Sequence, residues 1–194
     1  MNYLNYIIFI LAYLLGSIPF GLILSKCFLG LDIRTIGSGN IGATNVYRTG
    51  NKLIAIATLI LDCFKGFLAI LLAKQMNLQE TQIIMCGCLS IIGHIYPFWL
   101  KFKGGKGVAT AIAVVITITP LIGLVVMMIW LIMFICKKIS SLASIVATIF
   151  LPLLAAIFDY SSSIVAAYLI ISILILIKHI DNIKRLFCGE EKKI

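Results

Sequence analysis

Glycines, hydroxyl and amide side chains and fixed positive charge come together in the segment from Asp32 to Arg48. Its polar and small residues are Gly37, Ser38, Gly39, Asn40, Gly42, Thr44, Asn45 and two arginines, Arg34 and Arg48. Glycines allow backbone N–H groups to converge on an oxyanion, and an arginine fork matches the oxygens of a phosphate. Ordinary connections between helices need only a few turn residues. The segment therefore predicts an anion-binding loop.

A second loop of the same character runs from Phe102 to Thr110. It contains Gly104, Gly105, Lys106 and Gly107 and leads directly into an apolar helix. Backbone N–H groups at the start of a helix, together with the helix dipole, favour an anion, so this loop predicts a second phosphate site. The alternative is a basic loop that meets anionic lipid headgroups. A P-loop signature, Gly-x4-Gly-Lys-Ser/Thr, occurs nowhere in the sequence, which argues against an ATPase.

The last part of the chain carries a third polar cluster. His179, Asn182 and either Lys184 or Arg185 are spaced to lie near one face of a helix. Taken alone, this spacing fits a functional site and a histidine at the lipid interface equally well. The cluster indicates a functional site only when it is considered together with the two loops.

Other polar residues lie within or beside apolar stretches. Asp62 and Lys65 are three residues apart, so they are expected to pair on one helix face, either supporting a site or forming a structural ion pair. His94 is expected to be packed. Ser141 is predicted at a helix N-cap, with Ser144 one turn further on and able to face the same pocket. The six cysteines and two histidines lack the spacing of metal ligands, so no metal site is predicted.

The composition decides which elements position these residues. The chain of 194 residues is 62% apolar and 12% charged, whereas a soluble domain is typically about 45–50% apolar and about 25% charged. A water-soluble globule is therefore excluded, and lipid is the expected solvent. The net charge of +9 would suggest nucleic acid for a soluble protein, but here the basic residues fall in or beside gaps between apolar runs. Nucleic acid is not an expected partner.

The apolar runs predict an all-α polytopic membrane protein with a single domain over residues 1–194. Seven transmembrane helices are expected near residues 3–24, 53–73, 82–100, 108–119, 121–136, 141–158 and 162–177. The stretch 108–136 is divided in two because Pro120 and neighbouring residues offer a break. The first run lacks the features of a cleaved signal peptide and is expected to stay. Fourteen of the sixteen basic residues then share one side, which places the functional loops and the C-terminus in the cytoplasm and the N-terminus outside.

Taken together, these segments resemble a known family. Along almost its whole length the chain is similar to the acyl-phosphate:glycerol-3-phosphate acyltransferases of bacterial membranes, the PlsY family. The matching segments are Gly16–Gly21, Asp32–Arg48, Leu61–Gly66, Gly93–Pro97, Phe102–Thr110, Ser141–Ser144 and His179–Leu186. Several such segments in a fixed order make the match specific.

The resemblance implies an enzyme of the bacterial cytoplasmic membrane that acts early in phospholipid biosynthesis. It implies transfer of a fatty acyl group from acyl phosphate to the sn-1 hydroxyl of glycerol 3-phosphate, giving lysophosphatidic acid and phosphate. No cofactor is implied; the partners are the two substrates, membrane lipid and, transiently, the soluble enzyme that makes acyl phosphate. The main alternative is a transporter of organic phosphates, which only Asp62 and Lys65 favour, because a transporter site lies near the bilayer midplane.

The resemblance also implies roles for individual residues. Arg48 and Lys106 are expected to hold phosphate and stabilise the developing charge, and His179 with Asn182 to orient the glycerol hydroxyl. The general base is either His179 or a phosphate of a bound substrate. The tail glutamate of the family corresponds to Glu191, although Glu190 stands beside it. The implied substrate-binding residues are Ser38, Gly39, Asn40, Thr44, Asn45, Gly104, Gly105, Gly107, Ser144 and Glu191.

Overall fold

The structure, a computed structural model, describes residues 3–194, and the regular elements within them are all helical, as predicted. In chain order they are α1 (Tyr3–Gly16), α2 (Phe20–Leu29), η1 (Ile33–Thr35), α3 (Ala43–Tyr47), α4 (Lys52–Gln75), α5 (Glu80–Ile95), η2 (Phe98–Leu100), α6 (Val108–Ile118), α7 (Pro120–Lys137), α8 (Ser140–Ile157), α9 (Ser162–Lys178) and α10 (Ile180–Phe187). The chain divides into two compact units, Met1–Val114 (unit 1) and Val115–Ile194 (unit 2). The boundary falls within α6.

Several of these helices can cross a membrane. Among the described residues, four helical segments are long and apolar enough, namely α4, α5 continued through η2, α7 and α8. The bent pairs α1 with α2, at 41°, and α9 with α10, at 60°, raise the number to six if each pair is one span. Helix α6, with 11 residues, is shorter. The chain therefore has the helices of an integral membrane protein, and the seven-span arrangement stays a prediction.

The predicted division of residues 108–136 is confirmed. Helix α6 ends at Ile118 and α7 begins at Pro120, with Thr119 between them. Proline has no N–H to donate and its fixed φ suits the first position of a helix, so it starts α7 rather than continuing α6.

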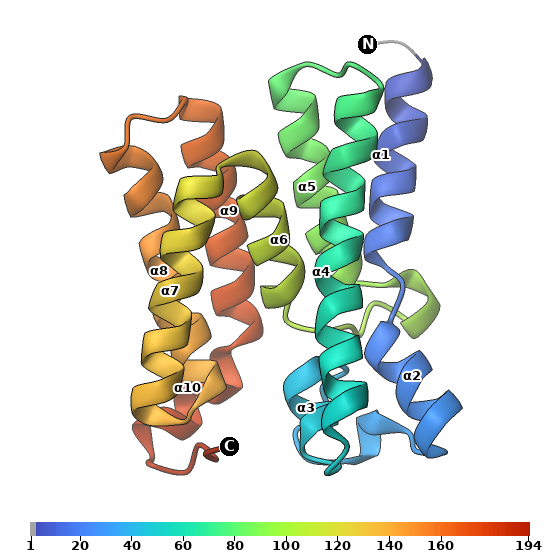
Figure 1. The fold of residues 1–194 in the computed structure, drawn as a ribbon, viewed down its shortest axis with the longest axis vertical. Helices are drawn as coiled ribbons and strands as arrows, with labels where there is room; N and C mark the ends of the chain where they lie inside the picture. The colour runs from blue at the N-terminus through green and yellow to red at the C-terminus, as the bar shows by residue number, and fades with distance from the viewer. Residues whose placement is uncertain (1–2) are drawn as a thin grey trace. The chain divides into compact units, whose positions relative to one another are not determined.

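Unit 1 is built on three helices, α1, α4 and α5, which lie side by side, with α2 and α3 around one half of α4 (Figure 1). Close approach of α1 and α5 depends on glycines. A Cβ added to Gly16 would lie 2.0 Å from the Ser90 carbonyl oxygen, and one added to Gly93 would lie 2.3 Å from that of Tyr13. These contacts bring the end of α1 against the last turns of α5. The loop that follows α5 therefore starts from a tightly packed base.

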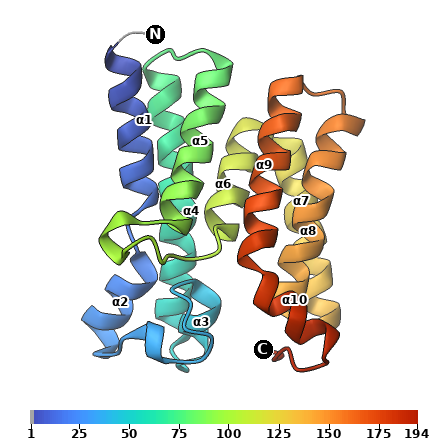
Figure 2. The ribbon, with the colours of Figure 1, turned by 180° about the vertical axis from the view of Figure 1, so that it is seen from behind.

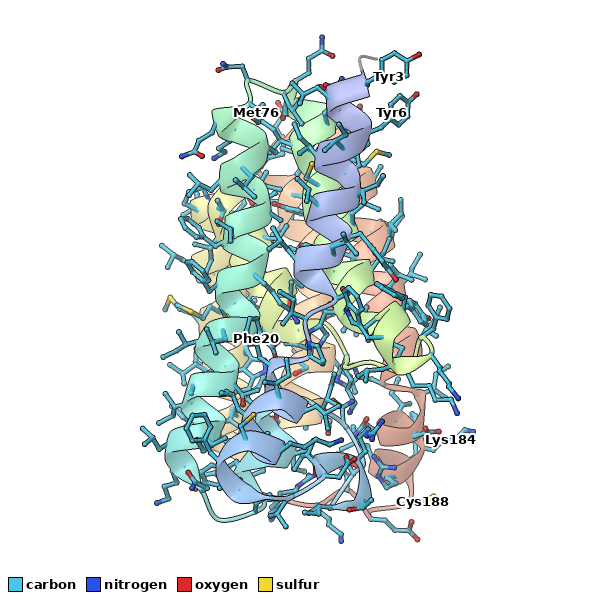
Figure 3. All side chains as sticks on the ribbon, turned by 90° about the vertical axis from the view of Figure 1, so that its right-hand side faces the viewer. Tyr3, Tyr6, Phe20, Met76, Lys184 and Cys188 are labelled. Carbon is cyan, nitrogen blue, oxygen red and sulfur yellow. The ribbon has the colours of Figure 1, made fainter. Side chains whose placement is uncertain are left out.

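Helix α1 ends at a break, Ser17–Pro19, before α2 begins. Figure 3 shows Tyr3, Tyr6 and Met76 at one end of unit 1, with Phe20, just after the break, well along the unit. The break is tied to the segment after α5, since the indole N–H of Trp99 donates to the Ser17 hydroxyl at 2.7 Å. Both polar loops of unit 1 lie in its half that contains α2, α3 and the start of α4 (Figure 2).

In unit 2, α7, α8 and α9 lie side by side, and α10 follows α9 at a bend of 60° and lies beside α8 (Figure 2). Polar contacts within the apolar helices join them: the Ser172 hydroxyl donates to the Thr148 carbonyl oxygen at 2.8 Å. The end of the chain returns to the loop between α7 and α8, where the Ile194 N–H donates to the Lys138 carbonyl oxygen at 2.8 Å. The tail is thereby held against the start of α8.

Candidate active site

The first loop is organised around the side chain of Asn45, which is 1% exposed. Its amide nitrogen lies 3.0, 2.9 and 2.8 Å from the carbonyl oxygens of Ile33, Ile36 and Asn40, to which it donates. Its amide oxygen accepts the Ser38 N–H at 2.9 Å. The Asn45 side chain is thus used in folding the loop. The prediction that it contacts substrate is not supported, because its polar atoms point into the protein.

Other polar groups of this loop also form hydrogen bonds within the loop. The Asn40 amide oxygen accepts the Gly42 N–H at 3.0 Å, just before α3 begins. The Gly39 N–H donates to the Ile36 carbonyl oxygen at 2.9 Å, and Gly39 has a left-handed φ of 69°, which favours glycine. These groups shape the turn, and their use in binding phosphate stays a prediction.

The two arginines of the loop differ in what they contact. Arg34 forms a fork with the Asp32 carboxylate, with N–O distances of 2.9 and 2.6 Å. Side-chain and backbone hydrogen bonds from Arg34 hold the pKa of Asp32 far below its usual range. The charge of Arg34 is therefore neutralised locally.

Arg48 remains available to bind an anion. Its guanidinium forms no hydrogen bond or ion pair with any of residues 3–194. Its aliphatic stem passes close to Gly37, where an added Cβ would lie 3.3 Å from Cδ of Arg48. Ser38, whose side chain is exposed, follows Gly37 directly, and Thr44 lies half-buried in α3. Arg48 is thus the cation of this loop that can meet an external phosphate.

The second loop packs its glycines against the end of α5. The Gly104 N–H donates to the Ile95 carbonyl oxygen at 3.1 Å, and the Gly105 N–H donates to that of His94 at 3.0 Å. An added Cβ at Gly104 would lie 2.2 Å from the His94 carbonyl oxygen. Both amides already donate to α5, so their predicted role in binding phosphate stays a prediction. Their glycines are required by close approach.

The residues next in the chain lie just before the start of α6. Lys106 is half-buried and stands two residues before α6, and Gly107 has a left-handed φ of 85°. The first N–H groups of α6, from Val108 to Thr110, have no carbonyl partner of their own helix to donate to. Lys106 therefore carries its charge to the end of a helix where anions are favoured.

The predicted pairing of Asp62 and Lys65 is confirmed. Both residues lie on α4, and Nζ of Lys65 is 2.8 Å from Oδ1 of Asp62. His94 is packed, as predicted, with 4% of its surface exposed, but it also lies 3.5 Å from the same carboxylate oxygen. Sequence reasoning did not link His94 to this pair because α4 and α5 meet only in the folded chain.

In unit 2, His179 stands at the bend between α9 and α10 and is 2% exposed. Its Nδ1 lies 2.8 Å from the Ile175 carbonyl oxygen. A carbonyl oxygen can only accept, so Nδ1 carries the proton and Nε2 carries the lone pair of the neutral ring. This tautomer presents Nε2 as the nitrogen that can accept a proton.

The tail carboxylate of Glu191 gathers three donors. It accepts from the Ser141 hydroxyl at 2.7 Å, the Asn182 amide at 2.6 Å and Nε of Arg185 at 2.7 Å. Burial opposes its ionisation, but these hydrogen bonds outweigh burial and hold the pKa of Glu191 below its usual value. Of the two tail glutamates, Glu191 makes these contacts, whereas Glu190 is exposed.

This cluster corrects one prediction and sharpens another. Ser141 does not cap a helix, because α8 begins at Ser140 and the Ser141 hydroxyl donates to Glu191. Asn182 and Arg185 lie on one helical face, as their spacing indicates, and share the carboxylate. Of the alternatives Lys184 and Arg185, it is Arg185 that joins the cluster.

Ser144 is held from two sides. Its hydroxyl donates to the Ser140 carbonyl oxygen at 2.9 Å and accepts the indole N–H of Trp130 at 3.0 Å. It is 4% exposed. The contact with Trp130 could not be found from the sequence, because a tryptophan in an apolar helix is equally expected to face lipid. The structure thus places Ser144 in the packing of α7 against α8.

Comparison with known proteins gives consistent matches. The family model described as glycerol-3-phosphate acyltransferase matches residues 6–189. The chain is 48% identical over 187 residues to the glycerol-3-phosphate acyltransferase of Ehrlichia canis (strain Jake), covering 96% of this chain and 97% of that one. It is 46% identical over 193 residues to that of Pelagibacter ubique (strain HTCC1062), covering 100% and 98%.

Solved structures match as well. The crystal structure of PlsY (YgiH), an integral membrane glycerol 3-phosphate acyltransferase, in its glycerol 3-phosphate form has a TM-score of 0.93 and 40% sequence identity, covering 98% of this chain and 95% of that chain. The lysophosphatidic acid form of that protein matches with a TM-score of 0.90.

Proposed function

The chain belongs to the glycerol-3-phosphate acyltransferase family and is an acyltransferase, and from this premise we propose that its acyl donor is acyl phosphate. The acceptor is the sn-1 hydroxyl of glycerol 3-phosphate, and the products are lysophosphatidic acid and inorganic phosphate. The observation that carries the proposal is Arg48, a guanidinium without an internal partner among residues 3–194 on a loop that Asn45 folds. A reaction between two phosphorylated substrates needs a cation whose charge no carboxylate of the protein already neutralises.

The reaction balances without an oxidant or reductant. The glycerol oxygen attacks the carbonyl carbon of the acyl phosphate, a new ester C–O bond forms, and the bond from that carbon to the phosphate oxygen breaks. The hydroxyl proton passes either to Nε2 of His179 or to a substrate phosphate oxygen. The Nδ1–H of His179, held by the Ile175 carbonyl oxygen, supports the first route because it leaves Nε2 basic.

Positive charge supports departure of phosphate. As the C–O bond breaks, negative charge grows on the leaving phosphate, and a cation already in position stabilises it without reorganisation. The planar guanidinium of Arg48 can donate two parallel hydrogen bonds to one phosphate group. Lys106 acts on the phosphate as a point charge at the start of α6. Asn182, which Glu191 holds at 2.6 Å, orients the hydroxyl beside His179 in this proposal.

The membrane topology is a further part of this proposal. We propose one integral membrane domain of seven spans in the bacterial inner membrane, with the short α6 as one span, the N-terminus outside and the C-terminus in the cytoplasm. The distribution of basic residues supports this arrangement. Cytoplasmic loops would also allow contact with a soluble enzyme that delivers acyl phosphate. Reporter fusions at each terminus test the orientation, and a cytoplasmic N-terminus would refute it.

The activity is tested with purified protein, labelled glycerol 3-phosphate and acyl phosphate. We expect lysophosphatidic acid well above a blank without protein, and we expect Arg48→Ala to abolish most of it while the protein still inserts. Arg34→Ala is the matched control, because Asp32 already neutralises that charge. Formation of product only with a different acyl donor would refute the proposed donor. Uptake of organic phosphate into vesicles without any product would favour the transporter.

A further inference from the structure

Three ionisable side chains that the proposed reaction does not use lie buried together in unit 1. Asp62 and Lys65 of α4 are paired at 2.8 Å, and Nδ1 of His94, in the last turn of α5, lies 3.5 Å from the same Asp62 oxygen. Their exposed fractions are 3%, 2% and 4%. Burying such groups is unfavourable unless they are paired, and residues of this kind within membrane helices commonly serve a function.

Two members of the cluster reach irregular or terminal segments of unit 1. Nζ of Lys65 donates to the Ile18 carbonyl oxygen at 2.8 Å, in the break between α1 and α2, and lies 5.8 Å from the centre of the Phe20 ring. The backbone carbonyl oxygen of Asp62 accepts the Thr110 hydroxyl at 3.0 Å, in the first turn of α6. The pair on α4 is therefore connected to the break of the first span and to the start of α6.

His94 connects the cluster to the second loop. Its carbonyl oxygen accepts the Gly105 N–H at 3.0 Å, and its ring lies so close to Gly105 that an added Cβ would be 2.0 Å from Nε2. Gly105 is the residue before Lys106. The His94 ring therefore packs against the residue before Lys106 and faces the Asp62 carboxylate through its other nitrogen.

We propose that Asp62, Lys65 and His94 are positioning residues that set the place of Lys106 by fixing the loop before it and the start of α6 after it. They touch no substrate in this proposal. The inference rests on the proposed function in one respect, namely that Lys106 binds a phosphate group. Asp62 orients the His94 ring, the ring supports Gly105, and Thr110 ties α6 to the backbone of Asp62.

The first test is steady-state kinetics of Asp62→Asn and His94→Ala. Misplacement of a reacting group by about 1 Å lowers activity about a hundredfold, so we expect a fall in kcat/KM of that order, with a raised KM for a phosphate substrate. Thr58→Val is the matched control: this buried α4 hydroxyl donates only to the Ile54 carbonyl oxygen of its own helix, at 2.8 Å. We expect it to leave the kinetics unchanged. Unchanged kinetics in Asp62→Asn and His94→Ala would overturn the proposal.

A double-mutant cycle separates positioning from general stability. In a Lys106→Ala background the group to be positioned is gone, so adding Asp62→Asn or His94→Ala should cost little further activity. Full additivity with Lys106→Ala would show that the cluster acts on the whole bundle and would overturn the inference. If Asp62→Asn does not insert, Gly105→Ala carries the same test, because its Cβ displaces the end of the His94 ring.

Hydrogen exchange gives a readout that does not depend on the proposed donor. The Gly104 and Gly105 amides donate to α5 carbonyl oxygens, so Asp62→Asn should speed exchange in the segment from Lys101 to Gly107 and leave α1 unchanged. Unchanged exchange in that segment would overturn the inference even if the wild-type enzyme makes lysophosphatidic acid. Conversely, a wild-type protein inactive with acyl phosphate would refute the proposed function while faster exchange still supported the positioning role.

Discussion

Replacing Asn45 by alanine is expected to loosen the first loop rather than remove a substrate contact. The side chain makes four hydrogen bonds, donating to the carbonyl oxygens of Ile33, Ile36 and Asn40 and accepting the Ser38 N–H. Alanine would leave each of these backbone groups without that partner. Ser38 and Arg48, which the loop carries, would then lose their fixed positions.

The size of the effect follows from the number of bonds. A hydrogen bond contributes about 1 kcal/mol net, and a buried group left unsatisfied costs about 1–3 kcal/mol. Because the amide has only two hydrogens for three carbonyl oxygens, the four contacts together are expected to contribute roughly 2–4 kcal/mol. This corresponds to an increase of about 30- to 1000-fold in the ratio of open to closed loop. Asn40→Ala loses the single bond to the Gly42 N–H, so an effect of only about 1 kcal/mol is expected.

Hydrogen exchange of the Ser38 amide, together with kinetics, measures this effect. We expect Asn45→Ala to speed exchange at Ser38 and to lower kcat/KM, with Asn40→Ala producing the same change at a smaller size. Both variants should leave exchange in α4 unchanged. A raised KM with normal exchange in Asn45→Ala would refute this reasoning and would return Asn45 to the role of a substrate ligand.

Three further predictions concern the charged and ionisable residues. Arg48→Lys keeps the positive charge but loses the two parallel hydrogen bonds of the guanidinium, so we expect kcat/KM to fall about 10- to 100-fold. The control Arg34→Lys should keep a kcat/KM near that of the wild type. Steady-state kinetics measures both values. His179→Gln should lower kcat about 10²- to 10⁴-fold if Nε2 takes the proton, and a smaller loss in single-turnover rates would assign that role to a substrate phosphate. Because the folded pKa of Glu191 is lowered, its carboxylate stabilises the tail above the unfolded value of about 4.3, and this stabilisation is lost as the pH falls through the folded pKa. Proteolysis of the tail between pH 3 and about 7 should therefore show an acid-dependent step that Glu191→Gln lacks.

Helices and their breaks could be predicted because they depend on neighbouring residues. Apolar runs predicted α4, α7 and α8 to within a few residues, and Pro120 predicted the start of α7. The ion pair of Asp62 with Lys65 followed from helical spacing alone. In each case the interacting groups are close in the chain, so their geometry is local.

Contacts between distant segments could not be predicted in this way. The Trp130 indole that reaches Ser144 and the His94 ring that faces Asp62 belong to different helices from their partners. The sequence shows that such groups exist but not which of them meet. The tail shows the same limit: Glu190 and Glu191 are chemically identical, and only the fold turns Glu191 toward Asn182.

The glycines of the second loop illustrate how one residue type supports two physical explanations. An absent side chain lets backbone N–H groups approach a ligand, and it equally lets backbone approach another helix. In this chain the second explanation applies to Gly104 and Gly105, whose N–H groups donate to Ile95 and His94 of α5. In the proposed function, recognition of phosphate by this loop is therefore assigned to Lys106 and the start of α6. It follows that Gly104→Ala, whose Cβ would press on the His94 carbonyl oxygen at 2.2 Å, should disturb the loop by displacing backbone from the end of α5.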